Sequence, residues 1–145
     1  MNFAAHIRES DGKEQSVAEH CTNVSEIAAE FAGKFGNADV ARQIGLFHDI
    51  GKYSEAFQRR IHHPDENNRV DHSTAGAVEL AKIRNSCGAF CVAGHHAGLP
   101  NLGGRADIKT DKTLKGRFNS FKKQHEDYSA FRKDISSETH VFPYQ

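Results

Sequence analysis

Six residues that could bind a metal ion stand out in this sequence, because they fall into four short, separate blocks. The blocks hold, in order, His20, the pair His48-Asp49, His72 and the pair His95-His96. Imidazole nitrogens and carboxylate oxygens together suit borderline transition metals such as manganese, iron, cobalt, nickel or zinc. A single histidine is more often a surface or hydrogen-bonded residue than a ligand. Their recurrence in four blocks nevertheless favours one shared metal site.

Other residues with reactive or ligating side chains have plainer interpretations. His62 and His63 precede Pro64 in a polar stretch, so we expect both at the surface. Cys87 and Cys91 could ligate a metal together, but both lie in the apolar stretch CGAFCVAG, where a buried thiol is the usual outcome. The chain has three cysteines, which is too few, and an odd number, for a disulfide framework. A reducing compartment suits such a chain.

The elements that must position the ligand blocks are expected to be helices. No segment shows a convincing strand alternation, whereas apolar residues recur at helical spacing along most of the chain. The expected helices cover Val17 to Phe35, about Asn37 to Gly51, Ser54 to Ile61, Asp71 or Ser73 to Ile83, Ala89 to His96, and Leu114 to Tyr128. The predicted fold class is therefore all-α, with His48, His72 and His95 at helix ends.

The first of these helices has the clearest pattern. Ser16 followed by Glu19 forms a capping box, and Gly36 is suited to end the helix. The residues expected on its buried face are Val17, Cys21, Val24, Ala28, Phe31 and Phe35.

Length, composition and charge set the broad class. With 145 residues, 37% hydrophobic and 26% charged, the chain fits one folded domain. It has no apolar run long enough to span a bilayer and no signal peptide, so the expected location is the cytoplasm.

The formal net charge is zero, but residues 105–123 carry a net charge of +5. Arg105, Lys109, Lys112, Lys115 and Arg117 are candidates for contacts with a nucleic-acid backbone, with a solvated helix face as the equally plain alternative.

Read with their neighbours, the four blocks resemble the HD-domain metal-dependent phosphohydrolase superfamily. The relevant segments are AEHC, GLFHDIGK, VDHS and GHHAGLP. The fuller segments GKYSEAFQRRI, VDHSTAGA and HHAGLP are most similar to the HD nuclease domain of type I CRISPR-associated helicase-nucleases. The likeness spans about residues 6–100.

The resemblance implies a helical bundle with its metal site in a central cleft. Asp49 would bridge two metal ions, His20 and His48 would hold one, and His72, His95 and His96 would hold the other. The cofactor would be one or two divalent ions, most typically manganese, iron, nickel or cobalt, with magnesium or zinc as alternatives. Lys52 would offset the negative charge of the phosphate in catalysis. A lysine at the C-terminal end of a helix is, however, also favoured by the partly negative end of the helix dipole. The implied substrate is single-stranded DNA, exposed by a superfamily 2 helicase in cis or in trans and cut beside the CRISPR surveillance complex in antiviral defence.

One departure from the family pattern bears on the size of the protein. Enzymes of this kind end their ligand set with an aspartate on a later helix. Asp107 and Asp111 follow His96 too soon, and the neighbours of Asp127 and Asp134 do not match the family motif. We therefore expect residues 1–145 to form one domain and to be the N-terminal part of a longer chain, with one side of the site short of ligands.

Three functions remain open at this point. The first is a DNA nuclease, acting within the strand or from its ends. The second is a phosphohydrolase of nucleotides, which would share the same metal core. The third is a non-catalytic metal-binding domain that docks onto a helicase. The chain lacks a GxxxxGK[ST] phosphate loop, so any unwinding must come from elsewhere.

Overall fold

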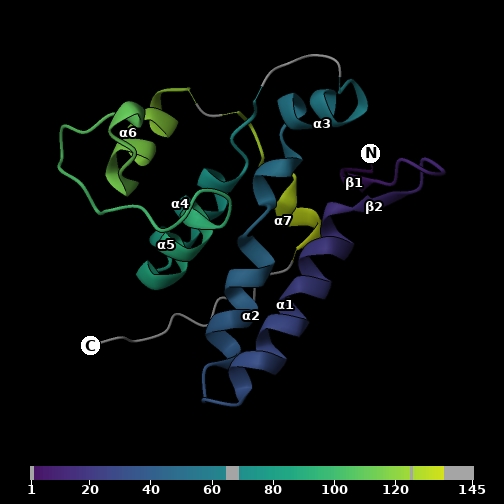
Figure 1. Ribbon diagram of the computed structural model, residues 1–145, viewed down its shortest axis with the longest axis horizontal. Helices are drawn as coiled ribbons and strands as arrows, with labels where there is room; N and C mark the ends of the chain where they lie inside the picture. Colours follow the sequence, from purple (N-terminus) through teal and green to yellow (C-terminus); the bar gives the residue numbers. More distant parts are fainter. Residues whose placement is uncertain (1, 65–68, 125, 136–145) are drawn as a thin grey trace.

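The computed structural model describes residues 2–64, 69–124 and 126–135. This part of the chain is mainly helical, as predicted (Figure 1). The elements are β1 (Ala4–Ile7), β2 (Glu14–Ser16), α1 (Val17–Gly33), α2 (Ala38–Phe47), η1 (Ile50–Tyr53), α3 (Glu55–His62), α4 (Ser73–Lys82), α5 (Ser86–Gly94), η2 (Lys109–Asp111), α6 (Leu114–Gln124) and α7 (Phe131–Asp134), where η marks a short 3-10 helix.

The helix α1 begins as its capping pattern indicates, but it buries a different face. The Ser16 hydroxyl accepts a hydrogen bond from the Glu19 amide at 3.1 Å. The buried residues are Val17, Cys21, Ser25, Ala29 and Ala32. Phe31 and Phe35 are 61% and 70% exposed, so the expected burial of both rings is wrong. The reason is the close packing of α1 against α2, which small side chains permit and phenylalanine rings would prevent.

The helices α2, α4 and α5 enclose the core and set the positions of the ligand-bearing ends. Phe47, Ala77, Leu80 and Val92 are among its buried residues. A side chain at Gly76 would place its Cβ 2.0 Å from the Phe47 carbonyl oxygen. The absence of that side chain lets α4 lie directly against the last residue of α2, one position before His48.

An N-terminal hairpin is the main departure from the all-α prediction. The strands β1 and β2 pair antiparallel, with Ala4 opposite Ser16 and His6 opposite Gln15. Strands of four and three residues are too short to show an alternating pattern, which is why the sequence did not reveal them. The Gln58 side chain of α3 receives a hydrogen bond from the Ala4 amide and donates one to the Ala4 carbonyl. These bonds hold β1 beside α3.

Smaller differences concern the second half of the chain. The helix α5 begins at Ser86 rather than Ala89, because the Asn85 side chain accepts a hydrogen bond from the Gly88 amide and caps it. Cys87 and Cys91 are exposed, so the expectation of buried thiols there is wrong. The helix α6 ends at Gln124, short of Tyr128. The predicted surface position of His62 and His63 is confirmed.

Glu79 ties α4 to the segment before and within α7, and its removal should weaken the fold. Its carboxylate accepts hydrogen bonds from the Tyr128 hydroxyl at 2.8 Å, from Lys82 at 2.7 Å and from Arg132 at 3.3 Å. Burial alone would raise the pKa of Glu79, but these donors outweigh it and hold the pKa below its ordinary value. The charged form therefore stabilises the fold above the unfolded-state pKa, and this contribution is lost as the pH falls through the lower folded-state pKa.

We expect Glu79→Gln to lower the free energy of unfolding at neutral pH by roughly 1–3 kcal/mol, since charge-assisted hydrogen bonds become neutral ones. The loss should shrink as the pH falls below the unfolded-state pKa of about 4.3, and it should vanish once the folded-state carboxylate is protonated. Urea denaturation across a pH series measures both effects. Glu55→Gln is the control, because the Glu55 side chain is 85% exposed in its pair with Arg59. A loss that does not vary with pH would contradict this account of Glu79.

Candidate metal centre

The ends of four helices bring the predicted ligand blocks together. His20 lies in the first turn of α1, His48 follows α2, His72 precedes α4, and His95 and His96 follow α5. Asp49 lies between them. One set of potential ligand atoms, all within 4.8 Å of one another, comes from Asp49, His72, His95 and His96. Two of the helices, α2 and α5, point their C-terminal, partly negative ends at this cluster, whereas α1 and α4 present their N-terminal, partly positive ends, so the helix dipoles offset one another.

The Oδ2 atom of Asp49 faces two imidazoles. It lies 3.1 Å from His20 Nε2 and 3.2 Å from His48 Nε2, and the two nitrogens are 3.1 Å apart. Ligand atoms around one ion with bonds of about 2.1 Å are separated by roughly 3.0–3.4 Å. The three atoms therefore form a triangle of the size of one face of a metal coordination shell.

The Oδ1 atom of Asp49 faces the other imidazoles. His72 Nε2 and His95 Nε2 each lie 3.5 Å from it, and His72 Nε2 is 2.8 Å from His96 Nε2. Oδ1 is buried and has no hydrogen-bond partner within the described residues. A buried carboxylate oxygen without a partner is costly unless a cation satisfies it. This orphaned atom is the observation that best fits a bound metal ion.

Two histidines are held in the orientation that a metal ligand requires. His48 Nδ1 lies 2.7 Å from the Gly45 carbonyl oxygen, and His95 Nδ1 lies 2.7 Å from the Val92 carbonyl oxygen. A carbonyl oxygen can only accept, so each Nδ1 carries a proton and donates it. In the neutral form of each ring the lone pair is therefore on Nε2, the atom that faces Asp49. Backbone carbonyls commonly orient metal-binding histidines in this way.

The charges of the cluster are also suited to a metal. Burial alone would raise the pKa of Asp49, but its close contacts with the imidazoles of His20, His48 and His95 prevail and hold that pKa far below its ordinary value. Asp49 is therefore an anion at any physiological pH. Burial lowers the pKa of His72 to about 4, so this ring is neutral and available as a ligand.

Comparison with protein families agrees with this geometry. The HD domain family matches residues 17–130, which is most of the chain. The chain belongs to the HD-domain family. No curated protein matches the sequence at a significant level. Together with the histidine and aspartate cluster, the match identifies this HD domain as a metal-dependent phosphohydrolase. Within the described ranges, no helix combines the length and the hydrophobicity needed to cross a membrane.

The HD domain also brings one histidine to the cluster that sequence reasoning missed. His6 of β1 forms a second set of potential ligands with His20 and Asp49, and its ring centroid lies 4.6 Å from that of His20. Only the pairing of β1 with the residues just before α1 places His6 there. No local pattern around His6 could have revealed it, because the partner strand lies across a turn.

The final carboxylate that the family pattern implies is not found among the residues that the structure describes. Asp107 accepts hydrogen bonds from the Gly104 amide and the Thr113 hydroxyl, and Asp111 accepts one from the Ile108 amide. Asp134 accepts a hydrogen bond from the Tyr53 hydroxyl at 3.1 Å. Neither set of ligand atoms contains a carboxylate other than Asp49. Among the described residues, the His20 side of the cluster thus gains His6 but no further carboxylate.

The residues predicted to contact nucleic acid differ in their exposure to solvent. Arg105, Lys109 and Lys112 are exposed, and Lys115 is half-buried. Arg117 instead reaches inward, where its guanidinium donates to the Ser73 hydroxyl at 2.8 Å and to the Ala93 carbonyl. It also contacts the Asp71 carboxylate at 3.4 Å. Arg117 therefore fastens α6 to the start of α4, next to His72.

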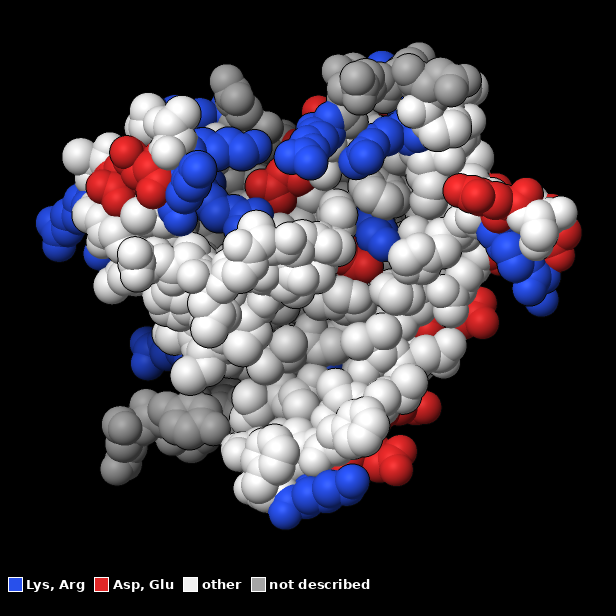
Figure 2. All heavy atoms as spheres, in the orientation of Figure 1, with Lys and Arg blue, Asp and Glu red and all other residues white. Residues whose placement is uncertain are grey.

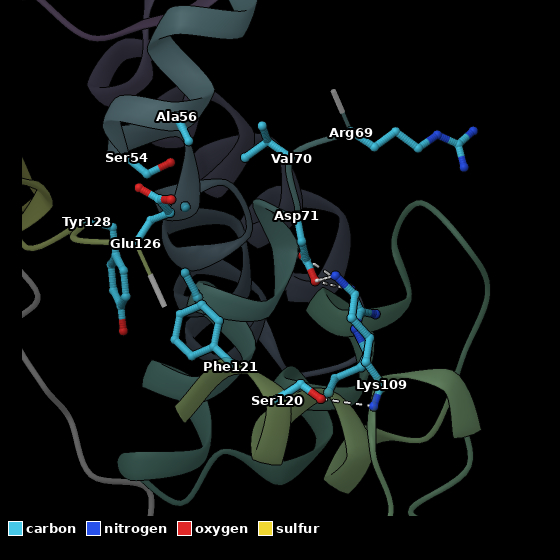
Figure 3. A pocket seen from close by; sticks show the side chains of 13 residues that line it. Ser54, Ala56, Arg69, Val70, Asp71, Lys109, Ser120, Phe121, Glu126 and Tyr128 are labelled. Carbon is cyan, nitrogen blue, oxygen red and sulfur yellow. Dashed lines mark hydrogen bonds and ion pairs between the residues drawn. The ribbon is translucent and has the colours of Figure 1, made fainter. Parts of the chain in front are cut away.

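A cavity of about 240 Å³ lies beside this contact (Figure 3). Asp71 and Lys109 border one side of it, and Glu126 and Tyr128 border the other, with Phe121 between them. None of the histidines of the candidate metal cluster lines this cavity. This cavity is lined by both acidic and basic side chains. A second cavity, beside His72 and His96, is lined by Lys52 and Arg60 and by no acidic side chain among the described residues.

Proposed function

We propose that this HD domain is a metal-dependent nuclease that cleaves phosphodiester bonds of single-stranded DNA in CRISPR interference. The proposal rests on one carboxylate, Asp49, placed between two groups of imidazoles. A carboxylate can bridge two cations, and two ions about 3.5–4 Å apart can stabilise both the attacking and the leaving oxygen of a phosphodiester displacement. The segments GKYSEAFQRRI, VDHSTAGA and HHAGLP support the narrower assignment to CRISPR interference.

A cavity beside the cluster offers room and charge for such a substrate. Its volume is about 350 Å³, and its lining includes His72, His96, Lys52 and Arg60 together with the apolar side chains of Phe57 and Ile61. Cationic groups beside the ligands suit phosphate oxygens, and the apolar wall suits a sugar or a base. The cavity therefore fits a nucleotide unit next to the ions.

Arg60 is the residue of this cavity with the clearest affinity for phosphate. It is exposed and has no ion pair among the described residues, whereas its neighbour Arg59 pairs with Glu55 at 3.2 Å. A guanidinium can bind a phosphate through two parallel hydrogen bonds. Sequence reasoning did not single out Arg60, because two successive arginines on a helix look alike until the cavity on one side is known.

Basic side chains on the surface outside the cavity could bind the backbone of a DNA strand that enters it. Figure 2 shows basic side chains gathered over α3, α6 and the loop before α6, whereas the far end of α1 and α2 carries scattered charges of both signs. The candidate contacts on the α6 side are Arg105, Lys109, Lys112 and Lys115. A strand entering the cavity past these residues would come from a superfamily 2 helicase, acting in cis or in trans with the CRISPR surveillance complex. We place this domain in the cytoplasm, where that DNA would be met.

Each group of residues in the site has a separate role in hydrolysis. A divalent ion bound here supplies Lewis-acid chemistry, since it acidifies a water molecule and offsets charge on phosphate oxygens. His48 and His95 keep their Nε2 lone pairs directed at that position through their backbone hydrogen bonds. Lys52 lines the cavity and presents an ammonium group to the phosphate. Arg60 holds a phosphate of the same strand at the rim.

We expect the protein to cleave circular single-stranded DNA with manganese or nickel and to lose this activity with a chelator. Arg60→Ala should lower kcat/KM on DNA by roughly 10- to 100-fold, because a charge-assisted contact to phosphate is lost. Arg59→Ala, the matched control, should stay within about twofold, since exposed ion pairs contribute little. Gel analysis of the circle also separates internal cleavage from digestion at ends.

The other outcomes distinguish the remaining functions. Hydrolysis of nucleotides without cleavage of DNA would replace the proposal by a nucleotide phosphohydrolase, which the size of the cavity also permits. Metal binding without any hydrolysis would favour a docking domain. If Arg59→Ala and Arg60→Ala lower kcat/KM on DNA equally, the cavity beside Arg60 does not bind the substrate.

A further inference from the structure

Lys52 gives the metal site an internal positive charge. Its ammonium nitrogen lies 2.9 Å from Asp49 Oδ2 and donates a hydrogen bond to the Ala5 carbonyl oxygen at 3.2 Å. Lys52 is 5% exposed and Asp49 is 3% exposed. A buried ion pair of this kind is electrically neutral and weakly screened by solvent. The carboxylate that must hold the metal thus already has a permanent counter-ion.

The ion pair makes the two sides of the cluster unequal. Oδ2 is shared by Lys52, His20 and His48 at 2.9–3.2 Å. Among the described residues, Oδ1 has no hydrogen-bond partner, and the imidazoles of His72 and His95 lie 3.5 Å from it. A first divalent ion therefore finds its better site at Oδ1, with His72, His95 and His96 as the remaining ligands.

A second ion at Oδ2 meets an unfavourable charge balance. The first ion and Lys52 both repel it, and the neighbouring ligands, His6, His20 and His48, carry no negative charge when they bind a metal. No second carboxylate joins the cluster in the ranges that the structure describes. A phosphate group would supply the missing negative charge, because Lys52 and His96 line the cavity in which it would lie.

We infer that Lys52 takes the electrostatic place of a second metal ion, so that the free protein binds one divalent ion tightly and a second enters only together with a phosphate group. Binding of the second ion and of phosphate must then favour each other to the same extent. The inference depends on metal binding by the histidine cluster and not on DNA as the substrate.

Equilibrium dialysis with manganese, followed by elemental analysis, tests the inference without any assay of hydrolysis. The wild-type protein should bind one equivalent of manganese alone and two in the presence of inorganic phosphate. Lys52→Met should bind manganese at least tenfold more tightly and take up two equivalents without phosphate. Methionine has a similar length and can pack against Phe57, whose ring centroid lies 5.4 Å from the ammonium nitrogen.

Lys82→Met is the matched control, because Lys82 pairs with Glu79 at the same spacing of three residues but away from the cluster. Its manganese binding should equal that of the wild type. Two tight equivalents in the wild type without phosphate would overturn the inference, as would a single equivalent in a folded Lys52→Met. If Lys52→Met does not fold, the wild-type measurements with and without phosphate decide the question. Failure to cleave DNA would leave these results unaffected.

Discussion

Asp49→Asn is expected to abolish metal binding and hydrolysis together. Both oxygens of Asp49 face imidazoles, so this side chain is the only described residue that can join the two sides of the cluster through a carboxylate. An asparagine keeps one weak oxygen ligand and loses the negative charge. Manganese affinity should fall by about 100-fold or more, and kcat by on the order of 1,000-fold, since several kcal/mol of charge stabilisation are lost.

The same substitution should also affect the fold, and a second variant separates the two effects. Asp49→Asn leaves the buried Lys52 ammonium without its carboxylate, a loss worth about 3–5 kcal/mol. Adding Lys52→Met should restore much of the free energy of unfolding without restoring metal binding. Calorimetric titration with manganese and urea denaturation measure the two quantities. Asp39→Asn, a control at an exposed position on α2, should leave both nearly unchanged. Metal affinity retained in Asp49→Asn would remove Asp49 from the site.

Gly51→Ala should damage the metal site from outside the ligand set. A Cβ atom at this position would lie 2.1 Å from the His72 carbonyl oxygen and 2.7 Å from His72 Cα. Both contacts involve backbone, so η1 and the start of α4 must move apart. That movement displaces Asp49 and His72 relative to each other. We expect a loss of roughly 2–5 kcal/mol in the free energy of unfolding and at least about a tenfold loss in manganese affinity.

Gly33→Ala is the matched control for this substitution. The added Cβ would meet only the Ala38 side chain, at an ordinary 3.8 Å, and Gly33 is the last residue of α1. Alanine should therefore be neutral or stabilise the protein by up to about 1 kcal/mol. Urea denaturation and manganese titration of both variants provide the comparison. If Gly51→Ala binds manganese as the wild type does, the contact between η1 and His72 does not position the ligands.

Sequence patterns predicted most of the cluster because its ligands depend on local features. Residue type indicates which side chains can bind a metal, and the capping residue Ser16 shows where α1 begins. Five histidines and one aspartate were predicted in this way, and the structure brings them together. The helix expected to reach Gly51 instead ends at Phe47, so that prediction is wrong. The helical class follows from the same periodicity, whereas strands as short as β1 and β2 leave no periodic signal.

Burial along a helix was harder to predict, because it depends on the partner. The apolar residues of α1 suggested one buried stripe that included Phe31 and Phe35. The close approach of α2 selects the small side chains Ser25 and Ala29 instead and turns both rings outward. The burial of Cys87 and Cys91 was wrongly predicted for a related reason, since α5 is apolar on more than one face and its packing against α4 and α2 decides which face is covered.

By itself, then, the sequence indicated the helical class, five histidines and one aspartate of the cluster and, through its family motifs, the class of chemistry. Only the tertiary structure decided how those ligands are used. It placed His6 in the cluster, turned Arg117 inward, opened the cavity beside Arg60 and joined Lys52 to one oxygen of Asp49. Each of these depends on distances between segments far apart in the chain. Helix periodicity and capping describe neighbours along the sequence, and charge balance in a buried site depends on neighbours in space.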